Sequence, residues 1–67
     1  MVTYQPFYDT LFRKGLTEYY LINKQGFSAH ILYRMRHGMN VTVETLDALC
    51  SILECDFCDI ISHIPDE

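Results

Sequence analysis

A short pattern occurs four times between residues 16 and 60, and it constrains the fold more than any other feature of the chain. In each occurrence an apolar residue precedes a Ser, Thr or Asp, and a second apolar residue follows four positions after that polar residue. The polar side chain can accept a hydrogen bond from the first turn of a helix, and the two apolar side chains can then touch across that turn. The pattern therefore predicts four short helices in one all-α domain. Its occurrences are Leu16-Thr17…Leu21, Phe27-Ser28…Leu32, Val41-Thr42…Leu46 and Cys55-Asp56…Ile60.

A further helix is predicted before these four. Pro6 suits the first turn of a helix, where its missing N–H costs nothing, and Gly15 can end that helix. Residues 2–4 suit a short extended segment, and Pro65 closes the last helix. No linker is long enough to divide the chain, so residues 1–67 are predicted to form a single compact five-helix domain. The predicted helices cover about residues 6–14, 18–25, 29–37, 43–53 and 57–63.

Residues 17–38 have the spacing of a helix-turn-helix. Thr17 and Ser28 are placed as N-caps of its two helices. Gly26 and Gly38 follow those helices, where glycine can adopt the left-handed conformation that ends a helix. Two capped helices joined by a tight turn that contains glycine are typical of this motif.

The length and composition are those of one small globular domain. The chain has 67 residues, 49% of them hydrophobic, and no apolar run long enough to cross a membrane. It begins MVTYQP, without the basic and apolar regions of a signal peptide, so we expect the cytoplasm. In that reducing compartment the three cysteines are expected to be thiols.

The charge is unevenly distributed along the chain. The net charge is −4, but all five basic residues lie within residues 1–39, together with only two acids. Residues 40–67 contain seven acids and no Lys or Arg, so the two parts carry +3 and −7. Such a dipole can orient its basic end toward a polyanion. The plainer alternative is that solvated surface charges have segregated by chance.

Two stretches, LTEYYLINKQGFSAHILYRMRHG and NVTVETLDALCSILECDFCDIISHIPDE, resemble the Cro/phage-repressor (XRE-type) helix-turn-helix regulators. The chain is most similar to small stand-alone bacterial and phage members that end in a segment of the type LC..L.CD..DII..IP. The resemblance implies a five-helix, lambda-repressor-like fold, binding of double-stranded DNA as a homodimer, and a function in transcription regulation. The most specific shared residues are Leu21, Gly26, Ser28, Leu32, Arg34, Gly38, Thr42, Leu46, Leu49, Cys50, Leu53, Cys55, Asp59 and Ile60.

Two positions depart from the family pattern. Many members have Gln at the position of Glu18, where the side chain contacts a phosphate. A glutamate there repels phosphate, although it suits the positive end of its own helix. Many members also have Ala at the position of Ile22, where the two helices of the motif cross closely, so a larger side chain there is expected to push them apart.

Helical periodicity separates the 29–37 helix into two faces. Leu32 and Met35 are predicted to face the core, together with Phe27 from the turn. The opposite face is the one that enters the major groove in a helix-turn-helix. Arg34 there can bind a guanine edge through two hydrogen bonds, while Tyr33 can bond a phosphate or pack on a thymine methyl group.

The predicted contacts fall into two groups. Singly, each of these side chains is better explained as an ordinary solvated surface residue, but together on one capped helix they favour DNA contact. The predicted base contacts are Ala29, His30, Tyr33 and Arg34. The predicted contacts to the DNA backbone are Thr17, Lys24, Ser28, Arg36 and His37.

The sequence does not favour a metal site or an enzyme. Cys50, Cys55, Cys58 and His63 are the residue types of a zinc site, but their spacing is unconvincing, and Cys50 and Cys55 are better explained as small core residues. The chain lacks a Gly-rich phosphate loop and a convincing nucleophile–base pair, so we expect no catalytic residues, no metal and no cofactor.

The sequence is therefore compatible with two functions. The first is a sequence-specific DNA-binding transcription regulator. The second is a helix-turn-helix scaffold used as a protein-interaction module, antitoxin-like or repressor-modulating. Glu18, Ile22 and the acidic second part of the chain, which could meet a basic protein, motivate the second.

Overall fold

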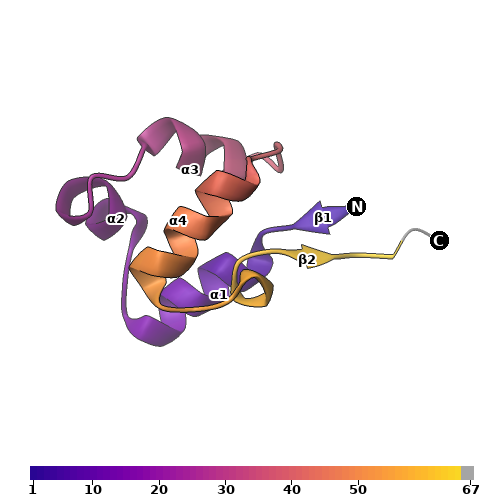
Figure 1. Ribbon diagram of the computed structural model, residues 1–67, viewed down its shortest axis with the longest axis horizontal. Helices are drawn as coiled ribbons and strands as arrows, with labels where there is room; N and C mark the ends of the chain where they lie inside the picture. Colours follow the sequence, from indigo (N-terminus) through magenta and orange to yellow (C-terminus); the bar gives the residue numbers. More distant parts are fainter. Residues whose placement is uncertain (66–67) are drawn as a thin grey trace.

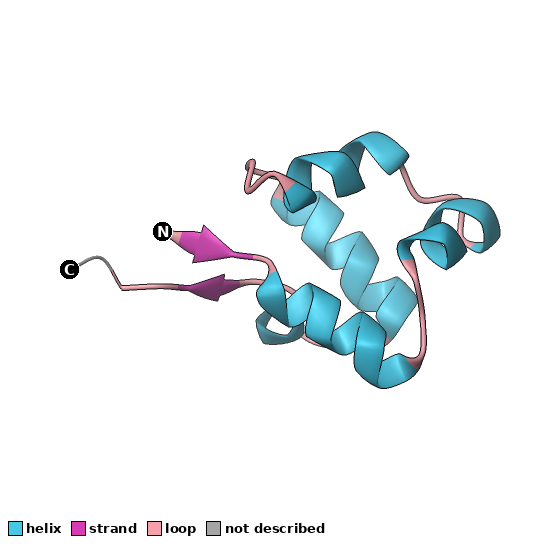
Figure 2. Ribbon diagram, turned by 180° about the vertical axis from the view of Figure 1, so that it is seen from behind, coloured by secondary structure: helices cyan, strands magenta, loops and turns pink. Residues whose placement is uncertain are grey.

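The computed structural model describes residues 1–65 as four α-helices, one 3-10 helix and a two-stranded antiparallel sheet. Helix α4 crosses the middle of the molecule, with α3 on one side of it and α1 and η1 on the other, while β1 and β2 run together away from the helices (Figures 1 and 2). The elements are β1 (Val2–Thr3), α1 (Gln5–Lys14), α2 (Glu18–Lys24), α3 (Ala29–Arg36), α4 (Val43–Leu53), η1 (Phe57–Asp59) and β2 (Ser62–His63).

The predicted N-caps are confirmed for three helices. Thr17 Oγ1 accepts a hydrogen bond from the N–H of Tyr20 at 3.1 Å, and Thr42 Oγ1 accepts one from Thr45 at 3.2 Å. Ser28 caps α3 in the same way. These local bonds explain why α2, α3 and α4 begin at the predicted residues, and all four α-helices end within one residue of the prediction.

The core is formed by one apolar cluster to which all four α-helices contribute, together with Ile60, the residue directly after η1. The second apolar residue of every repeated pattern belongs to it, so the repeat does mark the buried face of each element. Its buried members are Tyr4, Phe7, Leu11, Leu21, Leu32, Met35, Leu46, Leu49, Leu53 and Ile60.

The predicted fifth helix, residues 57–63, is wrong. Helical hydrogen bonding is limited to a single turn. Its last bonds are those from the N–H groups of Ile60 and Ile61, which both donate to the carbonyl of Phe57 at 2.9 Å. The chain then enters β2, whose Ser62 and His63 pair with Thr3 and Val2 in antiparallel register. The backbone partners of this segment therefore lie at the other end of the chain. The extended segment predicted over residues 2–4 is confirmed for Val2 and Thr3, whereas Tyr4 caps α1 with a φ of −101° and a ψ of 15°.

One buried polar contact holds η1 against α1. Thr10 is 1% exposed, and its hydroxyl donates to the carbonyl of Asp59 at 2.8 Å. Arg13 reinforces the contact, since its Nη2 lies 3.2 Å from Thr10 Oγ1 and 3.9 Å from Asp59 Oδ1. In residues 1–65, no helix has both the length and the apolar character needed to span a membrane.

Candidate nucleic-acid interface

The turn between α2 and α3 fixes how the second helix is presented. Gly26 has a φ of +68°, which an L side chain rarely adopts, and this lets the chain reverse directly after α2. The N–H of Phe27 then donates to the carbonyl of Leu21 at 2.9 Å. Leu21 and Leu32 are fully buried, and Ile22 is half-buried against the same core. The motif is thus anchored through its apolar face and leaves the other face of α3 in solvent.

A row of three rings lies on the solvent face of α3. The rings of His30 and Tyr33 are nearly parallel with centroids 6.5 Å apart, and those of Tyr33 and His37 are 4.1 Å apart. The Nδ1 atom of His37 also lies 2.9 Å from the carbonyl oxygen of Tyr33. Ala29 is exposed on the same helix. The row offers ring nitrogens, a hydroxyl and apolar ring faces to a ligand, in a largely fixed arrangement.

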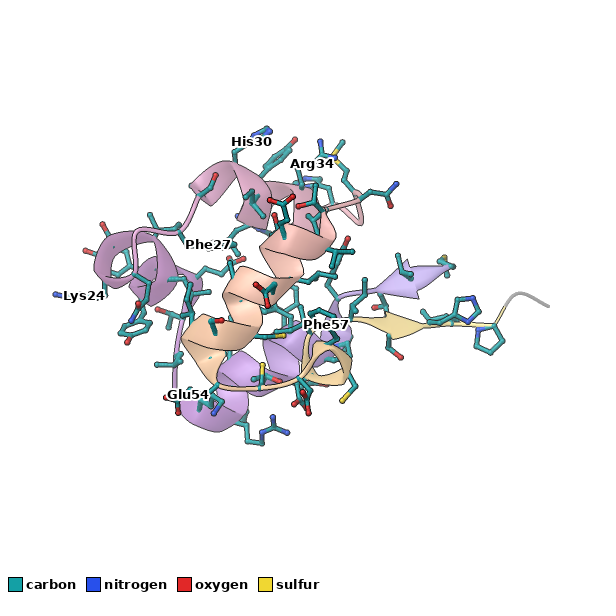
Figure 3. All side chains as sticks on the ribbon, viewed as in Figure 1. Lys24, Phe27, His30, Arg34, Glu54 and Phe57 are labelled. Atoms are coloured by element: carbon teal, nitrogen blue, oxygen red, sulfur yellow. The ribbon has the colours of Figure 1, made fainter. Side chains whose placement is uncertain are left out.

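Arg34 lies at the edge of this face and binds the chain itself. Its Nε and Nη2 atoms donate to the carbonyl of Asn40 at 3.2 and 2.7 Å, and the side chain is half-buried (Figure 3). The hydroxyl of buried Tyr4 donates to the neighbouring carbonyl of Met39 at 2.8 Å. Arg34, from the helix that precedes it, and Tyr4, from the start of the chain, therefore hold the loop between α3 and α4. Arg34 keeps Nη1 available for a ligand while bound in this way.

The same loop borders a shallow groove beside α3. His30 and Arg34 line one side of it, and Asn40, Thr42 and Thr45 line the other. Sequence reasoning missed these last three residues as candidate contacts. A signal was present, because Thr42 was identified as the cap of a helix whose free N–H groups can bind an anion.

The residues predicted to contact the DNA backbone differ in whether their side chains already bond to other groups of the chain. Lys24 extends from the end of α2 into solvent (Figure 3). Thr17 and Ser28 accept bonds as N-caps and retain their O–H donors.

Arg36 is paired within the chain. Its Nε lies 3.8 Å from Glu18 Oε1, and Glu18 also accepts a weak bond from Tyr8 at 3.5 Å. Burial, followed by the negative charge of Glu18, raises the pKa of the Tyr8 hydroxyl. The carboxylate at position 18 is therefore partly neutralised by Arg36, which reduces the repulsion of phosphate expected there.

Two further basic residues lie away from α3. Arg13 and Lys14 end α1, on the opposite side of the molecule from α3 (Figure 1), and Arg13 is paired with Asp59. The basic part of the sequence therefore does not form one continuous surface.

The cysteines gather at the junction of α4 and η1. Burial raises the pKa of the Cys50 thiol, and it raises the pKa of the Cys55 thiol to about 11, while Cys58 is exposed. Together with Asp47, Asp56 and the exposed ring of Phe57, they line a shallow hollow. Within the described part of the chain, no three His, Cys, Asp or Glu side chains form a group that could hold a metal ion.

Comparison with known proteins agrees with this geometry. A family model described as the Cro/C1-type HTH (helix-turn-helix) DNA-binding domain matches residues 11–66. A similar solved structure is the crystal structure of transcriptional regulator VanUg, Form II, with a TM-score of 0.85 and 29% sequence identity, covering 97% of this chain and 87% of that chain. No curated protein matches. The resemblance inferred from the sequence is confirmed, and the chain belongs to the family of Cro/C1-type helix-turn-helix DNA-binding domains.

Proposed function

We propose that this chain is a sequence-specific DNA-binding transcription regulator that places α3 in the major groove. The observation that carries the proposal is the exposed row of His30, Tyr33 and His37 on α3, with Arg34 at its edge. The similar regulator VanUg and the family of the chain support it. In this function the protein binds DNA and catalyses no reaction.

The side chains of this face suit base edges in different ways. Tyr33 and His30 can each donate or accept a hydrogen bond, and the methyl group of Ala29 can pack on a thymine methyl group. Arg34 can reach a guanine through Nη1 while it remains bound to Asn40.

The remaining contacts would position the domain on the DNA backbone. Lys24, Arg36 and His37 supply donors around α3, and Thr17 and Ser28 lie at the helix N-termini, where free N–H groups can bind phosphate. The groove residues Asn40, Thr42 and Thr45 extend this set. One small domain makes few contacts, so we propose that a homodimer binds two half-sites.

Selection of bound sequences from random duplex DNA tests this function. We expect the wild-type chain to enrich a defined motif, and Tyr33→Ala to lose preference at one or two positions of it. Phe12→Ala is the matched control, because Phe12 is an exposed aromatic residue (88%) on α1, away from α3. If the wild-type chain shows no sequence preference at low salt, the proposed function is wrong.

A second candidate is a protein-interaction module, favoured by the hollow at the junction of α4 and η1. Exposed Phe57 lies there beside Asp47 and Asp56, a combination that suits a basic partner with an apolar anchor. This candidate predicts that the purified chain is not retained on DNA or heparin, and that Asp47→Lys abolishes co-purification of a basic partner. Retention on DNA that Tyr33→Ala weakens favours the first function.

A further inference from the structure

The loop between α3 and α4 is held at two adjacent peptide groups by side chains from elsewhere in the chain. The loop turns at Gly38, whose φ is +69°, and the N–H of Met39 donates back to the carbonyl of Arg34 at 2.8 Å. The carbonyl of Met39 then accepts a hydrogen bond from the hydroxyl of Tyr4 at 2.8 Å. The next carbonyl, that of Asn40, accepts two bonds from Arg34. The position of Asn40 relative to α3 therefore depends on both Tyr4 and Arg34.

The bonds to Asn40 fix the orientation of the Arg34 guanidinium group. Its Nε and Nη2 atoms lie on one edge of this planar group, and they donate to the same oxygen at 3.2 and 2.7 Å. The outer edge keeps one N–H on Nη1 and one on Nη2, side by side. Two parallel N–H donors of this kind match O6 and N7 of a guanine. Because the side chain is half-buried and already ordered, less rotamer entropy is lost when that edge binds a base.

Tyr4 supplies the fixed end of this arrangement. It is only 4% exposed and belongs to the apolar core. Its own carbonyl accepts a bond from the N–H of Phe7 at 3.0 Å, in the first turn of α1. By contrast, Gly38, Met39 and Asn40 are all exposed. The buried phenol therefore gives the exposed part of the loop a rigid support.

Tyr4 and Arg34 reach the loop from different sides. Tyr4 and Gly38 line one shallow hollow, whereas Arg34 and Asn40 line the groove beside α3. Arg34 lies next to the loop at the end of α3 (Figure 3). Because Tyr4 is buried and lies outside the groove, it can act on a bound DNA only through the loop.

We propose that Tyr4 is a positioning residue for base recognition: its hydroxyl fixes the α3–α4 loop, and the Asn40 carbonyl of that loop orients Arg34 toward a guanine. The role rests on the proposed DNA-binding function, although Tyr4 itself lies outside the surface that meets DNA. The support at Asn40 is a backbone carbonyl, so it depends on where the loop lies and not on the side chain at position 40. Loss of the Tyr4 hydroxyl frees the loop, and Arg34 then loses the group that orients it.

Selection of bound sequences from random duplex DNA identifies the base pair that Arg34 reads, as the position where Arg34→Ala lowers the preference for guanine about fivefold or more. Tyr4→Phe keeps the buried ring and removes only the hydroxyl. It is expected to lower the guanine preference at that position about threefold or more and to leave the other positions unchanged. Tyr20→Phe is the matched control, because its hydroxyl accepts a bond from Gln25 and does not hold the loop.

Combined substitutions separate this role from a general effect on stability. In an Arg34→Ala background, Tyr4→Phe is expected to cause no further loss of guanine preference, because no guanidinium is left to orient. Arg34→Lys keeps the charge but cannot bind the carbonyl and the guanine through separate edges, so the preference should fall as in Arg34→Ala. Retention of the preference by Arg34→Lys, or an equal loss at every position in Tyr4→Phe, overturns the proposal.

Exchange of the Arg34 Nε–H with water, followed by NMR on the isotope-labelled chain, tests the coupling without DNA. Tyr4→Phe is expected to speed this exchange about threefold or more, since the bond to Asn40 opens more often, and Tyr20→Phe is expected not to. Unchanged exchange in Tyr4→Phe overturns the support of Arg34 by Tyr4. A wild-type chain without sequence preference contradicts the proposed function itself, whereas a preference that Tyr4→Phe leaves intact contradicts only the role of Tyr4.

Discussion

At the scale of single residues, the charges around α3 are partly satisfied within the chain. Arg36 lies 3.8 Å from Glu18, and Arg34 donates two bonds to Asn40. Periodicity predicted the exposure of Ala29, His30 and Tyr33, because it follows from their positions around the helix, although Arg34 on the same predicted face is half-buried. It could not predict these partners, because one lies on another helix and the other on the loop that follows α3.

Glu18→Gln is expected to strengthen DNA binding several-fold, because it removes a negative charge near α3 and releases Arg36. The slope of log affinity against log salt concentration should become steeper by about 1, the contribution of one additional phosphate contact. Stability should change by less than about 1 kcal/mol, since the ion pair is partly exposed. Fluorescence anisotropy with labelled duplex DNA at several salt concentrations measures both quantities. An unchanged slope shows that Arg36 does not contact the backbone.

The free energy of unfolding is expected to fall at alkaline pH because of the Cys55 thiol. The pKa of Cys55 is raised to about 11, above its usual value, so in the unfolded chain this thiol loses its proton at lower pH than in the folded chain. Above the unfolded pKa the folded state binds more protons, and the free energy of unfolding falls as pH rises toward 11. Urea unfolding from pH 7 to 11 should show this fall, and Cys55→Ala should reduce it. Equal pH dependence in both proteins contradicts this role of Cys55.

At the scale of elements, local sequence signals predicted four helices correctly and the fifth, over residues 57–63, incorrectly. The caps at Thr17, Ser28 and Thr42 are contacts between near neighbours, so they are visible in sequence. Residues 57–63 carry an equally good helical pattern, but the chain leaves the helix after one turn, and Ser62 and His63 pair with Thr3 and Val2 instead. Pairing across nearly the whole chain leaves no local signal, and here it overrides helix propensity.

Ser28→Ala is expected to lower the free energy of unfolding by about 1 kcal/mol, because the N–H of Ile31 loses its partner at the start of α3. Urea denaturation measures this loss, and Ser28→Thr, which keeps the hydroxyl, should restore most of it. A loss that Thr does not restore would point to packing around position 28 instead of capping.

The contact between α1 and η1 gives a second prediction at this scale. Thr10→Val keeps the shape of the buried side chain but removes the donor to Asp59, which should cost about 1–2 kcal/mol of unfolding free energy. Thr10→Ser keeps the donor and serves as the control in thermal unfolding. If Thr10→Val is as stable as the wild-type chain, this bond does not hold η1 on α1.

At the scale of the whole molecule, the fold separates two sets of basic residues that are close in sequence. Lys24 and Arg36 lie on the α2–α3 unit, whereas Arg13 and Lys14 lie at the end of α1 on the opposite side (Figure 1). The sequence places all the basic residues within residues 1–39, but only the fold shows which of them can meet one ligand.

Lys24→Ala is therefore expected to make the salt dependence of DNA binding shallower by about 1 in the log–log slope. Lys14→Ala removes the same charge from the far side of the molecule and should leave the slope unchanged. Affinity measured over a range of salt concentrations compares the two variants. An equal effect of both would mean that the domain uses a different surface.

The exposed face of α3 and the loop that follows it form the proposed DNA-binding surface. Amide chemical shifts of the isotope-labelled chain, followed during titration with a mixed-sequence DNA duplex at low salt, test it most directly. The largest changes are expected within residues 28–37 and 40–45, with little change in α1 and η1. Changes centred on Asp47, Asp56 and Phe57, or no changes at saturating DNA, would contradict it.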